Sequence, residues 1–524
     1  MIRFENVTFA YPGGSAALNN LNLHIARGEK VAIVGNNGSG KTTLALLING
    51  ILRPTSGTIS IDGLDPSVEQ DNRKLKQKVG LVFQNPDNQL VSTTVEREVA
   101  FSLENMNIPY DEMHRRVERM LQFFGLIDFR NKLTSDLSGG EKQRLALAAV
   151  MVAEPDILIL DEPGSYLDQT GKRLLNKAID LLLAEKKDLT VLRITQYAEE
   201  AELYKRMIVF GDGRVEADNT PERIFRNTTS PDSLGIDIPL KYQVVAGSLP
   251  DSANIAESST AVSVTAGNAA ILMDSVSFSY ESGPDNKLFD RLNLRLESGR
   301  VYGLVGPSGS GKTTLIQLLA GLIKPDSGRI NYEGFAPSPG KLVVSFQQPE
   351  RQFFLETVDR EIRFGAENLG FDNIEHIAGQ CYSLIGLDKD KYSGRNPFTL
   401  SGGEKRKLAF GTILSLKPEF IFFDEPTCGL DRQGIEKFKS MVARLKKDGV
   451  GMIIISHFGD IILDLADEII ALSKGKIETV QTREDFFHNT DYTDYLSTPD
   501  LIAFQQDVFG RIKFLDRSPL LGNV

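Results

Sequence analysis

Short runs of apolar residues recur along the chain, separated by longer segments of mixed polarity. Val31–Val34, Ile157–Leu160 and Phe420–Phe423 are uninterrupted runs of aliphatic and aromatic side chains. Such runs are typical of parallel strands buried on both faces, whereas half-exposed strands alternate apolar and polar positions. Leu44–Ile51 and Leu315–Leu322 are apolar segments that predict helices. The pattern therefore predicts an α/β fold.

The same sequence features occur twice. Gly35–Thr42 reads Gly-Asn-Asn-Gly-Ser-Gly-Lys-Thr, and Gly306–Thr313 reads Gly-Pro-Ser-Gly-Ser-Gly-Lys-Thr. Leu137–Lys142 and Leu400–Lys405 both read Leu-Ser-Gly-Gly-Glu-Lys. The copies lie roughly 270 positions apart, a period that is too long for a solenoid and that indicates a duplicated domain.

The stretch between the copies has a different composition. Residues 247–270 are rich in Ser, Ala, Gly and Asn and have no hydrophobic period, which predicts a flexible linker. We expect one domain over 1–246 and a second over 271–524. A chain of 524 residues is long enough for each domain to have its own core.

Composition and charge narrow the function classes. The formal net charge is −11 with both signs mixed along the chain, which argues against wide contact with nucleic-acid phosphates. Two cysteines, Cys381 and Cys428, cannot form a disulfide framework, which is typical of a reducing cytosol. The N-terminus has no signal-peptide pattern, and apolar runs fall short of the roughly 20 residues that span a bilayer. Any role at a membrane therefore requires docking onto another protein.

The two glycine-rich segments match the phosphate-loop pattern G-x-x-x-x-G-K-[ST]. Each follows an apolar run, Val31–Val34 or Val301–Val305, and precedes an expected helix, so that glycine N–H groups and the helix N-terminus bind phosphate. The lysine would reach the β- and γ-phosphates, and the first threonine would hold Mg²⁺. ATP and Mg²⁺ are the expected ligands. The candidate residues are Gly35, Gly38, Gly40, Lys41, Thr42, Thr43, Gly306, Gly309, Gly311, Lys312, Thr313 and Thr314.

Adjacent carboxylates end two of the apolar runs. Asp161 and Glu162 follow the run at 157–160, and Asp424 and Glu425 follow the run at 420–423. A buried strand delivers such groups to the edge of a sheet where a metal-bound phosphate would lie. We expect the aspartates to bind Mg²⁺ and the glutamates to orient and deprotonate the attacking water.

The Leu-Ser-Gly-Gly-Glu segments resemble the signature of the ATP-binding cassette (ABC) family, and the resemblance covers both halves almost end to end. It implies two tandem phosphate-loop NTPase domains, each with an α/β core, a helical signature subdomain and a small C-terminal extension. It also implies two ATP molecules, each between the phosphate loop of one half and the signature of the other, with both halves pairing within one chain. The signature residues are Ser138, Gly139, Gly140, Ser401, Gly402 and Gly403.

Further positions match the family motif by motif. Tyr11 and Tyr280 match the aromatic residue that stacks on adenine. The remaining matches are the glutamines that sense Mg²⁺ and the aspartates of the loop that crosses between cassettes, namely Gln84, Gln347, Asp168 and Asp431. We expect both glutamines to belong to the metal site together with the threonines and aspartates above.

The two halves differ at one expected catalytic position. The family has a histidine after a late strand, which contacts the γ-phosphate; the second half has His457 there and the first half has Gln196. An amide cannot become an imidazolium. Our hypothesis is that Glu425 and His457 carry most of the turnover while the Lys41 site hydrolyses ATP slowly. The alternative is that glutamine substitutes adequately, because Glu162 is intact.

A closer resemblance follows the two glutamines. Phe83–Leu90 (Phe-Gln-Asn-Pro-Asp-Asn-Gln-Leu) and Phe346–Phe353 (Phe-Gln-Gln-Pro-Glu-Arg-Gln-Phe) resemble energy-coupling factor ATPases, as do Val95–Phe101 and Val358–Phe364. This implies the motor subunit of a vitamin or metal importer at the cytoplasmic face of the cell membrane. Its partners would be a transmembrane T component and a substrate-binding S component. The alternatives are a soluble tandem cassette acting on ribosomes or DNA, and the fused ATPase of another importer class such as sugar uptake.

Overall fold

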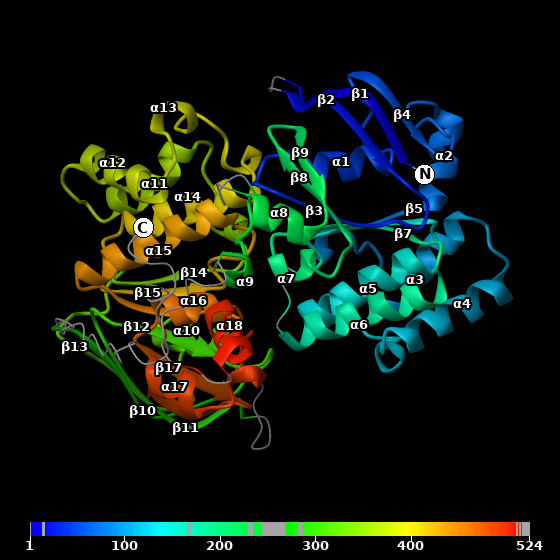
Figure 1. The fold of residues 1–524 in the computed structure, drawn as a ribbon. Helices are drawn as coiled ribbons and strands as arrows, with labels where there is room; N and C mark the ends of the chain where they lie inside the picture. The colour runs from blue at the N-terminus through cyan, green and yellow to red at the C-terminus, as the bar shows by residue number, and fades with distance from the viewer. Residues whose placement is uncertain are drawn as a thin grey trace. The chain divides into compact units, whose positions relative to one another are not determined.

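A computed structural model of the chain describes residues 2–12, 16–164, 167, 169–228, 234–243, 268–280, 287–509, 512 and 515. It divides into two compact units, Met1–Gln243 and Val244–Val524. Each unit has a six-stranded sheet and a three-stranded sheet, together with its own helices (Figure 1). The expected linker over 247–270 lies outside the described residues except for 268–270, where strand β10 (Ala270–Phe278) begins.

The six-stranded sheet has one strand order in both units. In the first unit the order is β5-β6-β7-β3-β8-β9, parallel except for the β8–β9 pair. The second unit repeats this as β14-β15-β16-β12-β17-β18, again with an antiparallel last pair. The strands are β3 (Lys30–Gly35), β5 (Val79–Val82), β6 (Ile157–Asp161), β7 (Thr190–Ile194), β8 (Arg206–Gly211), β9 (Arg214–Asn219), β12 (Val301–Val305), β14 (Leu342–Ser345), β15 (Phe420–Asp424), β16 (Gly451–Ile455), β17 (Glu468–Ser473) and β18 (Lys476–Thr482).

The central strands confirm the apolar pattern. Every residue of β6, β7, β15 and β16 is buried, because helices pack on both faces of a parallel sheet. The expected helices are shifted: they run over α1 (Lys41–Ile48) and α10 (Lys312–Leu319), beginning at the lysine of each loop. They end before Gly50 and Gly321, whose φ angles of 74° and 70° are left-handed and cannot continue a helix.

A three-stranded antiparallel sheet packs against the main sheet of each unit. Its strands are β1 (Ile2–Ala10), β2 (Ala16–Ile25) and β4 (Ser56–Ile61) in the first unit, and β10, β11 (Phe289–Glu297) and β13 (Ser327–Glu333) in the second. Apolar and polar positions alternate along β1 and β2, and the apolar face joins α1 and β3 in one core. This core holds the phosphate loop between two sheets.

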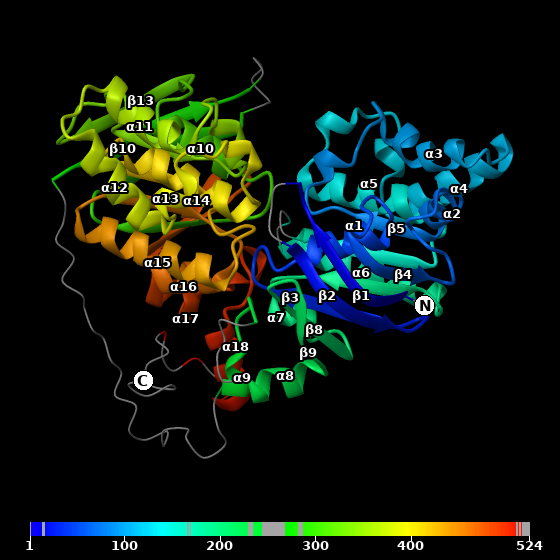
Figure 2. The same ribbon diagram turned by 90° about the horizontal axis from the view of Figure 1, so that it is seen from above.

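A helical subdomain follows the fifth strand of each unit. In the first unit it consists of α3 (Val95–Asn105), α4 (Tyr110–Phe123) and α5 (Gly139–Met151), which lie together at one end of that unit (Figure 2). The second unit has α11 (Val358–Asn368), α12 (Ile374–Ile385), α13 (Lys389–Tyr392) and α14 (Gly402–Leu414). The remaining core helices are α2 (Glu69–Lys78), α6 (Gln169–Glu185), α7 (Ala198–Ala201), α15 (Arg432–Lys447) and α16 (Gly459–Leu465).

Each unit ends in a small extension beyond its last strand. The extension contains α8 (Pro221–Asn227) and α9 (Leu240–Gln243) in the first unit and α17 (Arg483–Asn489) and α18 (Asp500–Phe509) in the second. Its apolar side chains are buried, among them Leu234, Ile236, Ile238, Phe486, Phe487 and Leu496. Among the described residues, none of the helices has the length and apolar character to cross a bilayer. The predicted α/β core, helical subdomain and C-terminal extension are therefore all present in both units.

Candidate active site

The phosphate loops connect β3 to α1 and β12 to α10. Gly35 and Gly306 have φ angles of 145° and 153°. A Cβ at Gly35 would lie 2.2 Å from the Phe210 carbonyl oxygen, and one at Gly306 would lie 2.0 Å from that of Leu472. Glycine is therefore required at the start of each loop by both its backbone conformation and the neighbouring strand.

The loop lysines are buried and held by the loop itself. Nζ of Lys41 donates to the carbonyl oxygens of Gly35 at 2.7 Å and Asn36 at 2.8 Å. In the second unit Nζ of Lys312 donates to Gly306 and Pro307 at 2.7 and 2.9 Å. These contacts place one positive charge at the centre of each loop, surrounded by backbone groups and the start of a helix, which is a setting suited to phosphate.

A hydroxyl and a carboxylate meet beside each loop. Oγ1 of Thr313 donates to Oδ2 of Asp424 at 2.9 Å. Both strand-end aspartates are buried, and burial raises their pKa; in Asp161 a hydrogen bond from Thr42 and the charge of Lys41 act in the opposite direction. Threonine and aspartate supply hard oxygen donors, and the donor set therefore fits Mg²⁺.

The two candidate bases share an unusual backbone conformation. Glu162 and Glu425 have φ angles of 47° and 49°, in the left-handed region that a non-glycine residue adopts at a cost. Their N–H groups donate to the carbonyl oxygens of Ile194 and Ile455, each at 3.1 Å, on the adjacent strand. Both side chains are buried. The conformation occurs at the same position in both units, directly after the aspartate that ends β6 or β15.

In the first unit Glu162 is the centre of an amide network. Nε2 of Gln84 donates to Oε2 of Glu162 at 2.8 Å, and Nε2 of Gln196 donates to Oε1 at 2.8 Å. Nε2 of Gln196 also donates to Oδ1 of Asn37 in the phosphate loop at 3.0 Å. Two segments far apart in the sequence thus donate to one carboxylate, and the phosphate loop joins the network through Gln196. Asn37 was missed by motif reasoning, because it occupies a variable position of the loop pattern.

In the second unit an imidazole takes the place of the Gln196 amide. Nε2 of His457 lies 3.3 Å from Oε1 of Glu425. Gln347 occupies the position after β14 that Gln84 occupies after β5, and it is half-buried. The structure thus brings the predicted glutamate together with the predicted histidine in this unit, and the predicted glutamate together with both glutamines in the first.

The predicted adenine-binding tyrosines lie against the helix that begins at each loop. The Tyr11 hydroxyl is 3.3 Å from Oγ1 of Thr43, and the Tyr280 hydroxyl is 2.8 Å from Oγ1 of Thr314. Tyr11 is 44% exposed and Tyr280 is 68% exposed, so each ring has an open surface beside its loop. This is an arrangement that suits stacking by a flat heterocycle.

The signature motifs begin helices α5 and α14. Each starts with a capping box: Oγ of Ser138 accepts from the N–H of Glu141, and Oε2 of Glu141 accepts from the N–H of Ser138. Ser401 and Glu404 repeat this arrangement. The capping serines are exposed, as are the glycines that follow them, Gly139 and Gly402; the next glycine is half-buried as Gly140 and buried as Gly403.

The crossing-loop aspartates differ in what the structure describes. Asp431 caps α15, with Oδ1 accepting from the N–H of Gly434 at 2.9 Å. The equivalent Asp168 lies outside the described residues.

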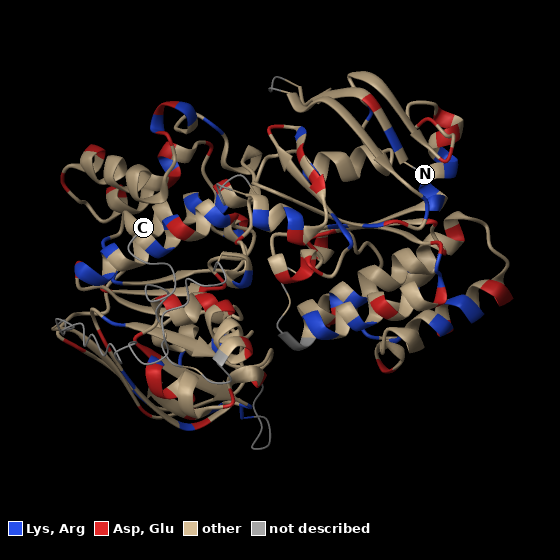
Figure 3. Ribbon diagram, in the orientation of Figure 1, with Lys and Arg blue, Asp and Glu red and all other residues tan. Residues whose placement is uncertain are grey.

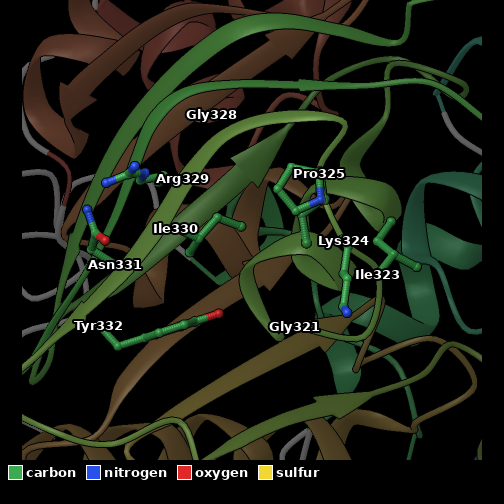
Figure 4. A pocket seen from close by; sticks show the side chains of 10 residues that line it. Gly321, Ile323, Lys324, Pro325, Gly328, Arg329, Ile330, Asn331 and Tyr332 are labelled. Atoms are coloured by element: carbon green, nitrogen blue, oxygen red, sulfur yellow. The ribbon is translucent and has the colours of Figure 1, made fainter.

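A separate open pocket of about 330 Å³ in the second unit lies between the end of α10 and β13 (Figure 4). Lys324, Arg329 and Tyr332 contribute to its wall, and none of the predicted site residues line it.

The fold and the loops define a duplicated phosphate-loop ATPase. The family model described as "ABC transporter" matches residues 18–165 and again 289–428. The chain therefore belongs to the ABC transporter family, contains two of its cassettes, and binds and hydrolyses ATP.

Relatives match along almost the whole chain. A protein of Methanosarcina acetivorans named as an ABC transporter ATP-binding protein is 31% identical over 91% of this chain and 85% of its own length. One of the same description from Methanosarcina mazei is 32% identical over 91% of this chain and 88% of its own. A solved structure, cbiO1 of Clostridium perfringens, described as part of the ABC transporter complex cbiONQ, is 38% identical over 43% of this chain and 90% of its own, with a TM-score of 0.40.

Proposed function

We propose that this protein is the ATP-hydrolysing motor of an energy-coupling factor type importer, bound at the cytoplasmic face of the cell membrane to separate transmembrane subunits. The observation that carries the proposal is an apolar surface repeated in both helical subdomains. Val91 and Phe354 occupy equivalent positions and are 67% and 63% exposed. Phe101 and Phe364 are also equivalent and are 44% and 39% exposed. Exposed apolar side chains that recur at matching positions favour protein docking.

A buried glutamate holds this surface in each unit. Oε2 of Glu98 accepts from the N–H groups of Val91 and Ser92 at 2.9 and 2.6 Å. Oε1 of Glu361 accepts from the N–H groups of Phe354 and Leu355, both at 2.6 Å. Charge-assisted hydrogen bonds of this kind fix the loop backbone. The apolar side chain is therefore presented outward by a rigid loop.

The apolar surface is connected to the candidate active site. Gln84 precedes it in the chain and donates to Glu162 at 2.8 Å. Asp87 lies between Gln84 and Val91 in the sequence. Its Oδ1 accepts from Nζ of Lys142, in the signature helix α5, at 2.7 Å. A partner that moves this segment would displace both the base and the signature helix. That connection supports coupling between ATP hydrolysis and a docked membrane protein.

The site residues have the following proposed roles. Lys41 and Lys312 bind the β- and γ-phosphates, and Tyr11 and Tyr280 stack on adenine. Glu162 and Glu425 orient the attacking water and accept its proton, with Gln196 and His457 beside them. Mg²⁺, when bound, would stabilise the negative charge of the phosphates. The residues proposed to hold it are Thr42, Gln84, Asp161, Thr313, Gln347 and Asp424.

We further propose two composite ATP sites, each joining the loop of one cassette to the signature of the other, as the family resemblance implies. One would pair Lys41 with Ser401, and the second would pair Lys312 with Ser138. The signature serine hydroxyl and glycine N–H groups would donate to the γ-phosphate, so that closure depends on ATP. The His457 site would carry most of the turnover.

A soluble tandem cassette acting on ribosomes or DNA is less well supported. Figure 3 shows Lys and Arg interspersed with Asp and Glu along the helices of both units. With a formal net charge of −11, this pattern does not favour an extended phosphate-binding face. The repeated surface at Val91 and Phe354 is apolar instead, which suits the docking of an amphipathic helix.

Purification from the native membrane tests the proposal. The tagged chain is isolated from detergent-solubilised membranes, and the proteins that accompany it are identified by mass spectrometry. We expect a multispanning T-like protein and a small S-like membrane protein. We expect Val91→Ser combined with Phe354→Ser to lose both, while Val480→Ser, at a position in β18 that is 45% exposed, keeps them. ATP binding by each variant establishes that it is folded.

The result separates the function classes. Integral membrane proteins that depend on the apolar surface support the transporter motor, and the small component identifies the vitamin or metal ion. A sugar-uptake permease in their place favours the other importer class. Ribosomal or DNA-bound proteins without an integral membrane protein would overturn the transporter proposal and leave the ATPase activity unaffected.

A further inference from the structure

The C-terminal extension of the second unit contacts the backbone at His457. Ser497 lies in the extension, between the turn at 492–494 and helix α18. Its N–H donates to the His457 carbonyl oxygen at 3.0 Å, and its Oγ accepts from the N–H of Gly459 at 3.0 Å. One residue of the extension therefore holds the polypeptide on both sides of Phe458, directly after the candidate catalytic histidine.

Gly459 shows how close this approach is. A Cβ at this position would lie 2.0 Å from the Ser497 carbonyl oxygen and 2.8 Å from Cδ of Pro499. Contacts this short do not occur, so any other residue would push the extension away from the loop. The next residue, Asp460, accepts from the N–H of Asp500 at 3.2 Å through Oδ1. Three of the four positions from 457 to 460, namely 457, 459 and 460, thus contact the extension.

The extension is itself firmly anchored. Leu496, adjacent to Ser497, is fully buried, and Tyr492 and Leu501 are 5% and 1% exposed. Phe487 packs edge-on against Tyr492 with ring centroids 5.2 Å apart. Because these apolar side chains are buried, the backbone of the extension is held in one conformation. The extension can therefore fix the position of the loop that it contacts.

The extension of the first unit also approaches its candidate active site. Ala198 stands at the position of Gly459, and Gln196 at that of His457. Here the extension approaches the phosphate loop: a Cβ at Gly235 would lie 2.3 Å from the nitrogen of Asn36. Each extension thus contacts a loop of its own candidate active site, and in the second unit this is the loop that carries the histidine.

We propose that Ser497 is a positioning residue for ATP hydrolysis: it fixes the His457 backbone so that the imidazole stays beside Glu425. This inference rests on the catalytic role proposed above for His457. Nε2 of His457 is 3.3 Å from Oε1 of Glu425. The orientation of the imidazole follows from the backbone at 457, and a rotation of that backbone would move the ring away from the carboxylate. The extension is then a structural part of the hydrolytic site.

Steady-state ATPase kinetics of the full chain test this inference. We expect Gly459→Ala and Ser497→Ala to lower kcat, the former about ten-fold, because a displacement of order 1 Å is enough to disturb a catalytic contact. KM for ATP should stay within about two-fold, since the nucleotide-binding residues are unchanged. Ser497→Thr keeps both the N–H and the hydroxyl and should retain kcat. The matched control is Gly379→Ala in α12, whose Cβ meets no atom of the described residues within 4 Å.

A combined variant distinguishes positioning from general damage. If Gly459→Ala acts through His457, it should cause no further loss in a chain that already carries His457→Ala. An equal loss in both backgrounds, or an unchanged kcat in Gly459→Ala and Ser497→Ala, overturns the positioning role. If Gly459→Ala does not fold, Ser497→Ala alone decides. A fully active His457→Ala chain overturns the role of His457 and this inference with it, whereas a lowered kcat in that chain with active Ser497 and Gly459 variants overturns this inference alone.

Discussion

Gln196 donates a hydrogen bond from Nε2 to Oε1 of Glu162 across 2.8 Å. In the second unit His457 occupies the position of Gln196, and its Nε2 lies 3.3 Å from Oε1 of Glu425. An amide remains neutral near pH 7, whereas an imidazole gains and loses a proton there. The two candidate sites therefore share a buried carboxylate on the same left-handed backbone and differ in the group beside it.

This difference predicts unequal contributions to turnover. We expect Glu425→Gln to remove most ATP hydrolysis by the full chain and Glu162→Gln to leave most of it. Replacing a general base by an amide lowers the rate at that site by about 10²–10⁴-fold. The rate of phosphate release at saturating MgATP measures the ATPase activity of the two sites together. If Glu425→Gln leaves most of the activity and Glu162→Gln abolishes it, the assigned asymmetry is wrong.

Exchange of the differing residue tests its cause. In a chain that carries Glu425→Gln, we expect Gln196→His to raise the remaining ATPase activity about three-fold or more, because the imidazole can contact both the γ-phosphate and the base. Gln196→Asn is the control, since it keeps an amide and shortens the side chain. Equal activities for the histidine and asparagine variants would indicate that glutamine substitutes adequately and that the asymmetry has another origin.

The tyrosine beside each loop predicts an effect on nucleotide affinity. We expect Tyr280→Ala to raise KM for ATP about three- to ten-fold with little change in kcat, which corresponds to loss of one aromatic stacking contact. Tyr280→Phe keeps the ring and loses only the 2.8 Å contact with Thr314, so its KM should stay near that of the unaltered protein. Steady-state ATPase rates over a range of ATP concentrations give both KM and kcat. A phenylalanine variant as impaired as the alanine variant would assign the effect to the hydroxyl.

Much of the fold follows from local sequence. The runs at Ile157 and Phe420 are apolar throughout, and a buried parallel strand is the structure that accommodates such a run. The loop glycines occur at fixed spacing because neighbouring backbone leaves no room for a Cβ at Gly35 and Gly306. These signals lie within a few residues of the feature that they predict, and a duplication repeats each of them.

Features that depend on distant segments could not be predicted. The Gln84–Glu162 contact joins residues 78 positions apart, and nothing at either position indicates that the glutamine expected at the metal site also donates to the candidate base. The φ angle of 47° at Glu162 lies in a region that glutamate rarely adopts, so the residue type does not predict it. The contact between Ser497 and His457 likewise requires the folded extension. Long-range hydrogen bonds thus determine the parts of the site that motifs leave open.

A buried ion pair between Arg193 and Glu200, which flank Gln196 in the sequence, distinguishes the first unit from the second. Nη2 of Arg193, on β7, lies 2.6 Å from Oε1 of Glu200, and both side chains are almost wholly buried. Oγ1 of Thr195 donates to the same carboxylate at 2.6 Å, and Oδ1 of Asn176 accepts from Arg193 at 2.7 Å. Burial lowers the pKa of the Arg193 guanidinium and the charge of Glu200 raises it. The pKa is raised overall. The second unit has Ile454 and Ile461 at the two charged positions.

The second unit therefore indicates how the pair can be replaced. We expect Arg193→Ile alone to destabilise the first unit by about 3–5 kcal/mol, because Glu200 would remain buried without its partner. Adding Glu200→Ile should recover at least half of that loss, since an aliphatic pair needs no desolvation of charge. Hydrogen exchange of the peptide that contains β7, in the full chain, measures the local free energy of opening. The matched control is Arg206→Ile, which breaks half-exposed ion pairs with Glu29 and Asp218 and should cost less. A double variant as unstable as Arg193→Ile would mean that the lost contacts to Asn176 and Thr195, and not the unpaired charge, dominate.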